Sequence, residues 1–348
     1  MKLLFVNHRD VYHPQAGGAE NVILEVAKRL VKRGVDVSWL SEAVGSPPNT
    51  VEGVKLLHAG NQVSLHLHSL RFAREYDVVV DSVAHAVPFF SYLVNRKSIA
   101  LVHHVHQEVV KYELNPLTAL LVRQLEKGVR SYPWIISVSN TTKRDLVSLK
   151  VDPSRVTVIH NGIDHSLYRP GEKSSTPTIL WIGRMKRYKN PLDAIQMFRR
   201  LRRRATLIIA GGGELEGEVR RAIQGESNIK YLGRVPEEKK VELYQRAWVV
   251  LSTSFIEGWG MTVVEANACG TPVVGYARGS IPEIIQDGVN GFLVPYKDLD
   301  AMARRVEYLL DEGVMREFSR ASYQSSLKYD WEKTAEQYYE KMREVAES

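Results

Sequence analysis

Strand-like apolar runs alternate with helix-like periods along nearly the whole chain, and this alternation limits the fold more than any other feature. Residues 2–7 (KLLFVN) form an apolar run and residues 8–18 a polar loop. Residues 19–32 then carry apolar side chains at helical spacing before Gly34 ends the helix. Parallel strands need long crossover connections, which helices usually supply. The sequence therefore predicts an α/β protein with parallel sheets covered by helices.

The strand-like runs fall into two series. The first series comprises residues 2–7, 35–40, 77–80, 98–103 and 134–139, and the second comprises 178–182, 206–210, 229–232, 248–252, 272–275 and 291–294. A polar stretch at 165–176 separates the series, and 348 residues are many for a single core. We expect two doubly wound domains, residues 1–168 and 169–329, followed by a charged amphipathic helix at 330–348.

Charge and composition exclude several classes of protein. The formal net charge of +7 suits polyanions, phosphorylated ligands or an anionic membrane surface. No zinc-type Cys/His spacing and no RNP-like aromatic pattern occurs, so we expect no nucleic-acid partner. The single cysteine and an N-terminal apolar run too short for a signal peptide predict a cytoplasmic protein. The apolar stretch 77–94 contains Asp81, His85 and Pro88, which argues against a membrane span.

In open parallel sheets, ligands bind beyond the carboxyl ends of the strands, and with two domains the default site is the cleft between them. Residues 255–274 (FIEGWGMTVVEANACGTPVV) follow such a strand and contain Glu257 and Glu265. A retaining hydrolase needs carboxyl groups about 5 Å apart, whereas eight helical residues span roughly 12 Å. We therefore expect separate roles. Gly258 and Gly260 favour an anion at the helix N-terminus, and a carboxylate can bind the vicinal diol of a ribose. The alternative is a helix-terminal charge at Glu257 and a solvated Glu265.

Basic residues occupy another loop that follows a strand, residues 183–190 (GRMKRYKN). Arg184 and Lys189 would neutralise a diphosphate and stabilise the charge that develops as it leaves. The alternative is a solvated basic loop, since residues 199–204 are also basic without any obvious chemistry.

Two further candidate loops lie in the first half. Gly17 and Gly18 in residues 13–21 allow a phosphate or sugar to approach the backbone, although a plain turn is the alternative and no GxGxxG is present. His103, His104 and His106 end a strand. Their spacing disfavours zinc, so we expect one histidine to contact a sugar and the others to be structural.

With these motifs in place, the chain resembles the retaining nucleotide-sugar glycosyltransferases of GT-B fold, family 4. The most specific match is residues 255–295, the E-x7-E region with its flanks. The segments VIHNGID (158–164), IGRMKRYKN (182–190), LIIAGGGE (207–214) and YLGRVPEEK (231–239) occur in the family's order. The resemblance covers nearly the whole chain. It implies two Rossmann-like domains facing across a cleft and a C-terminal helix that crosses back to the first domain.

The resemblance also implies roles for matching residues. Arg184 and Lys189 would hold the donor diphosphate, Glu257 the transferred sugar and Glu265 the ribose. His103 would face the transferred sugar, with His104 as the alternative register. Backbone contacts to the donor are implied at Gly17, Gly18, Arg234, Val235, Gly260, Met261, Thr262 and Val263, with Arg234 and Val235 beside the base.

We expect a hexosyl transfer with retention from a nucleotide diphosphate sugar, with UDP or GDP as the favoured base and no cofactor or metal. The acceptor hydroxyl would belong to a glycolipid, a lipid-linked saccharide, a polysaccharide or a small molecule in glycan or cell-envelope biosynthesis. A sugar-nucleotide epimerase and a non-catalytic nucleotide-sugar-binding protein are the alternatives. Residues 65–74 and 117–130 mix apolar and basic side chains, which fits either half-buried helices or peripheral contact with the inner face of the cell membrane.

Overall fold

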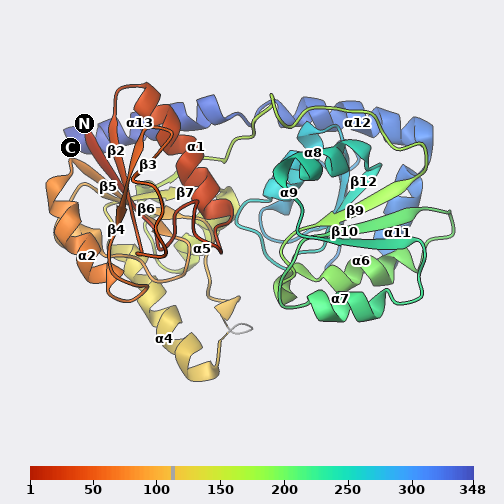
Figure 1. The fold of residues 1–348 in the computed structure, drawn as a ribbon, viewed down its shortest axis with the longest axis horizontal. Helices are drawn as coiled ribbons and strands as arrows, with labels where there is room; N and C mark the ends of the chain where they lie inside the picture. Colours follow the sequence, from red (N-terminus) through yellow and green to blue (C-terminus); the bar gives the residue numbers. More distant parts are fainter. Residues whose placement is uncertain (111–113) are drawn as a thin grey trace. The chain divides into compact units, whose positions relative to one another are not determined.

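The computed structural model describes residues 1–110 and 114–348, which form two compact α/β units (Figure 1). Unit 1 consists of Met1–Gly162 together with Trp331–Ser348, and unit 2 of Ile163–Asp330. Residues 163–168, which we expected at the end of the first domain, therefore belong to unit 2. Two α/β units with parallel sheets confirm the predicted fold class.

Unit 1 is built on an eight-stranded sheet in the order β3-β4-β2-β1-β5-β6-β7-β8. All neighbouring strands are parallel except the short β3, which pairs antiparallel with β4. The strands are β1 (Lys2–Val6), β2 (Asp36–Ser41), β3 (Thr50–Val51), β4 (Val54–His58), β5 (Val78–Val83), β6 (Ser98–Val102), β7 (Trp134–Ser137) and β8 (Val156–Val158). The helices are α1 (Gly18–Lys32), α2 (Leu65–Phe72), α4 (Pro116–Glu126), α5 (Asn140–Ser148) and α13 (Trp331–Glu347), with short 3-10 turns η1 (Ala73–Glu75), η2 (Ser91–Leu93), η3 (Lys127–Ser131) and η4 (Pro153–Arg155).

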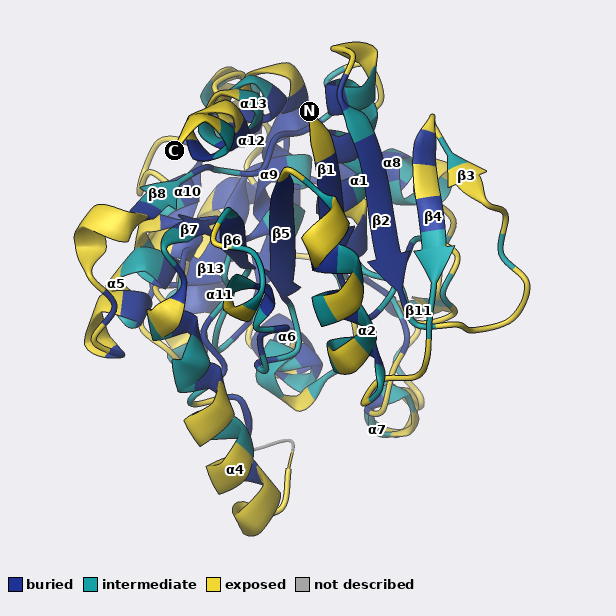
Figure 2. Cartoon of the chain, turned by 90° about the vertical axis from the view of Figure 1, so that its left-hand side faces the viewer, coloured by how far each residue is buried: buried dark blue, intermediate teal, exposed yellow. Residues whose placement is uncertain are grey.

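The central strands of unit 1 are buried along their length because helices cover both faces of the sheet (Figure 2). Every residue of β5 and β6 is buried. Strands β3, β4 and β8, which we did not predict, are two to five residues long and only partly buried. Their apolar signal is correspondingly weak.

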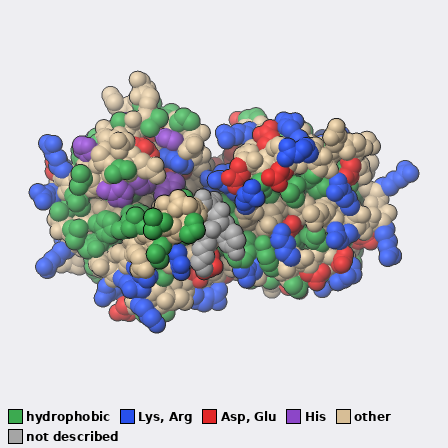
Figure 3. All heavy atoms as spheres, turned by 90° about the horizontal axis from the view of Figure 1, so that it is seen from below, with side chains coloured by type: hydrophobic (Ala, Val, Ile, Leu, Met, Phe, Trp, Pro, Cys, Tyr) green, Lys and Arg blue, Asp and Glu red, His purple; other side chains and the backbone are tan. Residues whose placement is uncertain are grey.

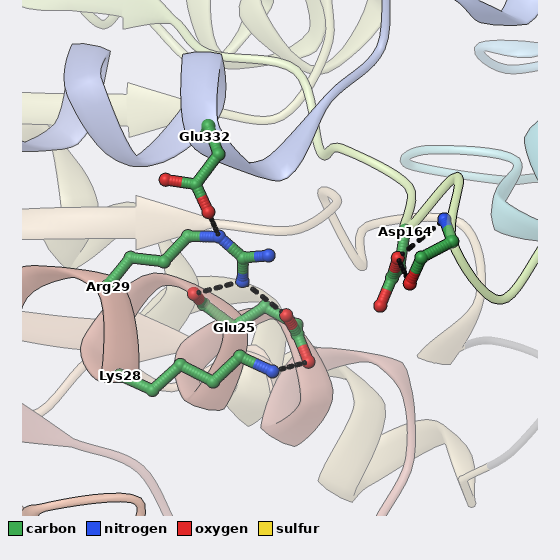
Figure 4. Close-up of polar contacts among 6 residues, drawn as sticks. Glu25, Lys28, Arg29, Asp164 and Glu332 are labelled. Atoms are coloured by element: carbon green, nitrogen blue, oxygen red, sulfur yellow. Dashed lines mark hydrogen bonds and ion pairs between the residues drawn. The ribbon is translucent and has the colours of Figure 1, made fainter. Parts of the chain in front are cut away.

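Helix α13 packs against α1 within unit 1 because one of its faces is apolar and fully buried at Ala335, Tyr338 and Met342. Polar contacts fix this packing (Figure 4): Arg29 donates from Nε to Glu332 at 2.6 Å and also binds Glu25. The C-terminal charged helix is therefore part of the first unit's core.

Unit 2 is built on a six-stranded, wholly parallel sheet in the order β11-β10-β9-β12-β13-β14. The strands are β9 (Thr178–Ile182), β10 (Thr206–Ala210), β11 (Ile229–Gly233), β12 (Val249–Ser252), β13 (Val273–Tyr276) and β14 (Gly291–Val294). The helices are α6 (Pro191–Phe198), α7 (Glu216–Ala222), α8 (Glu237–Arg246), α9 (Met261–Ala268), α10 (Ile281–Ile284), α11 (Leu299–Leu309) and α12 (Glu312–Ser326), with a 3-10 turn η5 (Arg187–Lys189). All six strands expected in the second half are present.

The strand order of unit 2 decides which loops meet. Strands β9 and β12 are neighbours although about 70 residues separate them in the chain. Since both run in the same direction, the loops after them emerge at the same edge of the sheet. These are the loops that carry Lys189 and Glu257.

Candidate functional site

The loops after β9 and β12 are hydrogen-bonded to each other along their length. Phe255 N donates to Tyr188 O at 2.7 Å, Asn190 Nδ2 donates to Thr253 O at 3.0 Å, and Thr253 Oγ1 donates to Lys189 O at 2.7 Å. These bonds bring two predicted site residues together. Lys189 Nζ forms an ion pair with Glu257 Oε1, which also accepts a 2.7 Å bond from Ser254 Oγ.

The Lys189–Glu257 pair is largely enclosed, since the side chains are 16% and 17% exposed. An ion pair at this depth is stronger than one on the open surface. An anion that binds Lys189 would have to displace Glu257 from it. Anion binding at Lys189 would therefore release the Glu257 carboxylate for another partner. The sequence predicted both residues but not their contact.

A third loop clamps the backbone of Glu257. Ser280 N donates to Glu257 O at 3.0 Å. Gly279 has φ +56°, and a Cβ there would lie 2.7 Å from both the backbone nitrogen and the backbone oxygen of Glu257. Only glycine fits this position. Gly279 was not predicted from the sequence, although the Arg-Gly-Ser that follows strand β13 was the available signal.

Helix α9 begins at Met261, directly after the glycine loop. The backbone amides predicted to bind the donor begin at Gly260, and two of those that follow already donate hydrogen bonds within the loop. Met261 N donates to Trp259 O and Val263 N donates to Gly260 O, each at 2.9 Å. A Cβ on Gly260 would meet Ile281 Cδ1 at 2.7 Å, so tight packing against α10 explains that glycine. Thr262 lies in the same first turn.

Arg184 and Arg234 are exposed and lie in loops that approach each other closely. A Cβ on Gly211 would lie 1.8 Å from Gly183 O, so the ends of β9 and β10 touch through backbone atoms. The Arg234 side chain runs along Gly212 and is followed by the half-buried Val235. Arg184 contacts Tyr188 Oη at 3.5 Å, which leaves its guanidinium available for an anion.

Glu265 is not the solvated helix residue of the alternative interpretation, since its side chain is only 12% exposed. Lys240 Nζ lies 3.1 Å from Oε1, and Tyr244 Oη donates to Oε2 at 2.8 Å. Both partners come from helix α8, where they are one turn apart. Neither Lys240 nor Tyr244 was predicted from the sequence.

In unit 1, the predicted glycines begin helix α1. Gly17 N donates to Glu20 Oε2 at 2.7 Å, while Asn7 Nδ2 donates to Glu20 Oε1 at 2.7 Å. A Cβ on Gly18 would meet nothing within 4 Å, so sterics of the described residues do not demand glycine there. The loop is thus tied to the end of β1 through Glu20.

The predicted histidines follow β6. His103 Nε2 lies 3.1 Å from Ser82 Oγ, and burial, followed by the nearby His106, lowers the pKa of His103 to about 4. His106 is structural: its backbone N and Nδ1 lie 2.6 and 3.1 Å from Glu126 Oε1. The rings of His104 and His106 are 3.8 Å apart.

A second histidine cluster, which the sequence analysis missed, lies at the same edge of the sheet. The His8 ring packs against His66, His85 and Phe89 with centroids 4.8–5.3 Å apart. Burial is the main cause that lowers the pKa of His8 to about 3. Histidine side chains gather visibly on this face of unit 1 (Figure 3). These residues come from separate segments, so no local motif announces them.

Residues 1–110 and 114–348 contain no group of three or more His, Cys, Asp or Glu side chains arranged to hold a metal ion. Within the same residues, no helix is both long and apolar enough to cross a bilayer.

Comparisons with known proteins identify the family of the chain. The family model "Glycosyltransferase Family 4" matches residues 16–167 and "Glycosyl transferases group 1" matches residues 167–325. The D-inositol 3-phosphate glycosyltransferase of Mycolicibacterium smegmatis is 28% identical over 372 residues, which cover 92% of this chain and 85% of the relative. That of Acidothermus cellulolyticus is 24% identical, with coverages of 92% and 84%.

Solved structures share the fold over both units. HepE of Anabaena, in complex with UDP-glucose, has a TM-score of 0.82 and 20% identity and covers 99% of this chain and 100% of its own. The sucrose-phosphate synthase of Thermosynechococcus elongatus has a TM-score of 0.81 and 19% identity, with coverages of 99% and 98%.

Proposed function

The chain belongs to the family 4 glycosyltransferases of GT-B fold, and from this premise we propose that it moves a hexosyl unit from a nucleotide diphosphate sugar to an acceptor hydroxyl with retention of anomeric configuration. Both family models describe glycosyltransferases, the relatives named above are D-inositol 3-phosphate glycosyltransferases, and HepE was solved in complex with UDP-glucose. The stereochemical course, the acceptor and independence from metals are the parts that we propose.

The Lys189–Glu257 pair at the carboxyl edge of the unit 2 sheet is the observation that carries the proposal. A donor diphosphate is a stronger partner for Lys189 than one carboxylate, because it brings two negative charges and several acceptor oxygens. Glu257 would then turn to a sugar hydroxyl. Arg184, exposed in the same loop, would bind the second phosphate.

The reaction needs one bond made and one broken. The acceptor oxygen attacks the anomeric carbon on the face from which the diphosphate leaves, while the bond from that carbon to the phosphate oxygen breaks with its electron pair. A diphosphate oxygen takes the acceptor proton. Lys189 and Arg184 stabilise the charge that builds on the leaving group, and the protein contributes positioning and electrostatics rather than a covalent nucleophile.

A thermal-shift screen across UDP-, GDP- and ADP-sugars identifies the donor, and product analysis by NMR then assigns the anomer. The acceptor panel should include D-inositol 3-phosphate, on which the relatives' name is based. An α-linked product from an α-linked donor, formed equally in EDTA, supports the proposal. An inverted product, an epimer of the donor formed without acceptor, or donor binding with no turnover would each contradict it.

We further propose that an anionic membrane surface carries or presents the acceptor. Helix α4 exposes four leucines, Leu117, Leu120, Leu121 and Leu125, at 79%, 53%, 59% and 39% (Figure 2). Its single acidic residue, Glu126, is buried against His106, whereas Arg123 and the following Lys127 are partly exposed. Exposed leucines beside Arg123 and Lys127 are a composition that favours contact with anionic lipid.

Flotation with vesicles of anionic phospholipid tests this surface. Wild-type protein should float at low salt and less at high salt, and Leu117→Ser/Leu121→Ser should stay at the bottom. Leu327→Ser is the matched control, since this 39% exposed leucine belongs to unit 2. Absence of binding at either salt concentration, or equal flotation of the double variant, would refute the membrane assignment.

A further inference from the structure

The Glu265 carboxylate is held by a separate side-chain donor on each of its two oxygens. Its two oxygens are bound separately, Oε1 by Lys240 Nζ at 3.1 Å and Oε2 by Tyr244 Oη at 2.8 Å. Tyr244 is 1% exposed and Lys240 about a fifth exposed, so both donors reach Glu265 from the interior side of helix α8. One donor on each oxygen fixes the plane of the carboxylate.

This arrangement leaves half of the carboxylate's accepting capacity unused by the two donors. An ionised carboxylate has about four lone-pair sites on two oxygens. Lys240 and Tyr244 use one site on each oxygen. The remaining site on each oxygen matches the two hydroxyls of a vicinal diol, which is the feature that distinguishes a ribose from a 2′-deoxyribose.

Lys240 is itself held in place from two further sides. Its Nζ lies 3.2 Å from Glu237 Oε1 and 5.3 Å from the centroid of the Tyr168 ring, while Tyr168 Oη donates to Glu237. Burial alone would favour a neutral amine, but Glu265 and Glu237 together outweigh it and raise the pKa of Lys240. Burial and the neighbouring Glu265 raise the pKa of Tyr244 well above its ordinary value, so its hydroxyl remains a donor.

We propose that Lys240 and Tyr244 are positioning residues that hold Glu265 for the O2′ and O3′ hydroxyls of the donor, and that they thereby set the enzyme's preference for ribonucleotide over 2′-deoxyribonucleotide donors. The proposal rests on the donor role of Glu265 in the proposed function. It assigns a purpose to the Glu237–Lys240–Glu265 chain, in which one cation serves two carboxylates.

Binding of free nucleotides tests the proposal without any acceptor. Calorimetry should compare UDP with 2′-deoxy-UDP, and GDP with 2′-deoxy-GDP, for wild type, Glu265→Gln, Lys240→Met and Tyr244→Phe. Hydrogen bonds to a charged group contribute about 1.5–3 kcal/mol, so we expect the wild type to prefer the ribonucleotide by roughly tenfold or more. Each variant should reduce the ratio of ribonucleotide to 2′-deoxyribonucleotide affinity several-fold, while binding of the deoxynucleotide changes less.

Two controls separate positioning from folding. Lys239→Met removes the adjacent lysine, whose exposed side chain pairs with Glu242 at 2.8 Å, and should leave the ratio unchanged. Lys240→Arg keeps the charge and should retain most of the preference for the ribonucleotide. Tyr244→Phe keeps the buried ring, and melting temperatures verify that the variants are folded.

The outcomes distinguish this proposal from its premise. Loss of the preference in Glu265→Gln, with reduction in Lys240→Met and Tyr244→Phe, supports both. Loss in Glu265→Gln alone overturns the positioning role while the donor role of Glu265 stands. A preference that survives Glu265→Gln overturns the premise that Glu265 binds the donor ribose. A wild type that binds the ribonucleotide and the 2′-deoxyribonucleotide equally overturns the proposal entirely.

Discussion

The carboxyl edges of the two sheets carry different kinds of side chain. At the carboxyl edge of the unit 2 sheet, charged side chains pair with each other, as Lys189 does with Glu257 and Lys240 with Glu265. At the same edge of the unit 1 sheet, uncharged imidazoles gather, with the pKa of His8 lowered to about 3 and that of His103 to about 4. One topology thus supports a charged loop cluster and a neutral one.

This difference corresponds to what each unit would hold. A nucleotide diphosphate carries fixed negative charge, and a cation already paired with a carboxylate is ready to exchange partners with it. A sugar or acceptor hydroxyl can be bound by a carboxylate or by a neutral imidazole, and the imidazole provides one donor and one acceptor. We propose that the charged groups of unit 2 hold the donor, and that the imidazoles of unit 1 contact hydroxyl groups.

Removing the cation of the charged cluster should have the largest effect. Lys189→Ala leaves the leaving diphosphate without its buried ammonium and Glu257 without its partner, so we expect kcat to fall about 100- to 1,000-fold. Steady-state kinetics with the identified donor measures this. Lys186→Ala is the control, because that lysine is more exposed and lies 3.9 Å from Glu214. Near-normal kcat and donor KM in Lys189→Ala would show that the assignment is wrong.

Disturbing the backbone beneath Glu257 should have a smaller effect of the same kind. In Gly279→Ala, the new Cβ would lie 2.7 Å from the nitrogen and oxygen of Glu257, so that loop must shift. We expect kcat to fall by roughly 10- to 100-fold, because small misplacements of positioning groups are costly.

Gly288→Ala is the matched control for that strain. Gly288 also has positive φ, at +76°, but a Cβ there would meet nothing within 4 Å. Its cost should be about 1 kcal/mol of stability with kcat unchanged. Equal kcat in the two alanine variants would mean that the contact of Gly279 with Glu257 has no bearing on activity.

These predictions use residues that differ in how far the sequence reveals them. Lys189, Glu257 and Glu265 stand in local motifs, so their identity could be predicted from the chain alone. Their partners could not. The contact of Lys189 with Glu257 depends on β9 lying beside β12, and Gly279 and Lys240 reach the site from other crossovers.

The fold shows the same limit. Strands of unit 2 such as β12 are continuous apolar runs, because a parallel sheet covered on both faces buries every side chain, and they were predictable. Strands β3, β4 and β8 lie at the ends of the unit 1 sheet and are half-exposed, so their sequences carry no such run. The histidine cluster around His8 was invisible because its members share only a sheet edge.

The neutral cluster predicts acid sensitivity in unit 1. His8 and His103 stay neutral when folded but bind a proton below about pH 6.5 when unfolded, and the pKa of His66 is lowered too. The unfolded state therefore binds more protons, and stability should fall as pH decreases from about 6.5 towards 4, by at most about 1.4 kcal/mol per pH unit for each histidine. Asp81 opposes this between about pH 4 and 6, because burial raises its pKa to about 6.

Hydrogen exchange read by mass spectrometry tests this in each unit separately. Unit 1 peptides should lose protection between pH 6.5 and 4.5, and His103→Asn should flatten that loss by about one histidine's share. Asp81→Asn should steepen it, because the opposing group is gone. If His103→Asn and wild type show the same pH slope, His103 is charged in the folded protein and the neutral character of the cluster is refuted.

The smallest effect concerns Lys173, a partly enclosed lysine of unit 2 that stands apart from the charged pairs. Lys173 donates from Nζ to Thr271 at 2.5 Å, and burial lowers its pKa from 10.5 to about 7. Between pH 7 and 9 the unfolded state holds this proton and the folded state does not, so unit 2 should gain stability as pH rises. Cys269 offsets this only above pH 9, since burial raises its pKa to about 12.

Lys173→Met should abolish the rise of stability with pH in unit 2 peptides over pH 7–9, measured by hydrogen exchange, whereas Lys230→Met, at an exposed lysine, should keep it. A slope that persists in Lys173→Met would place the titrating group elsewhere.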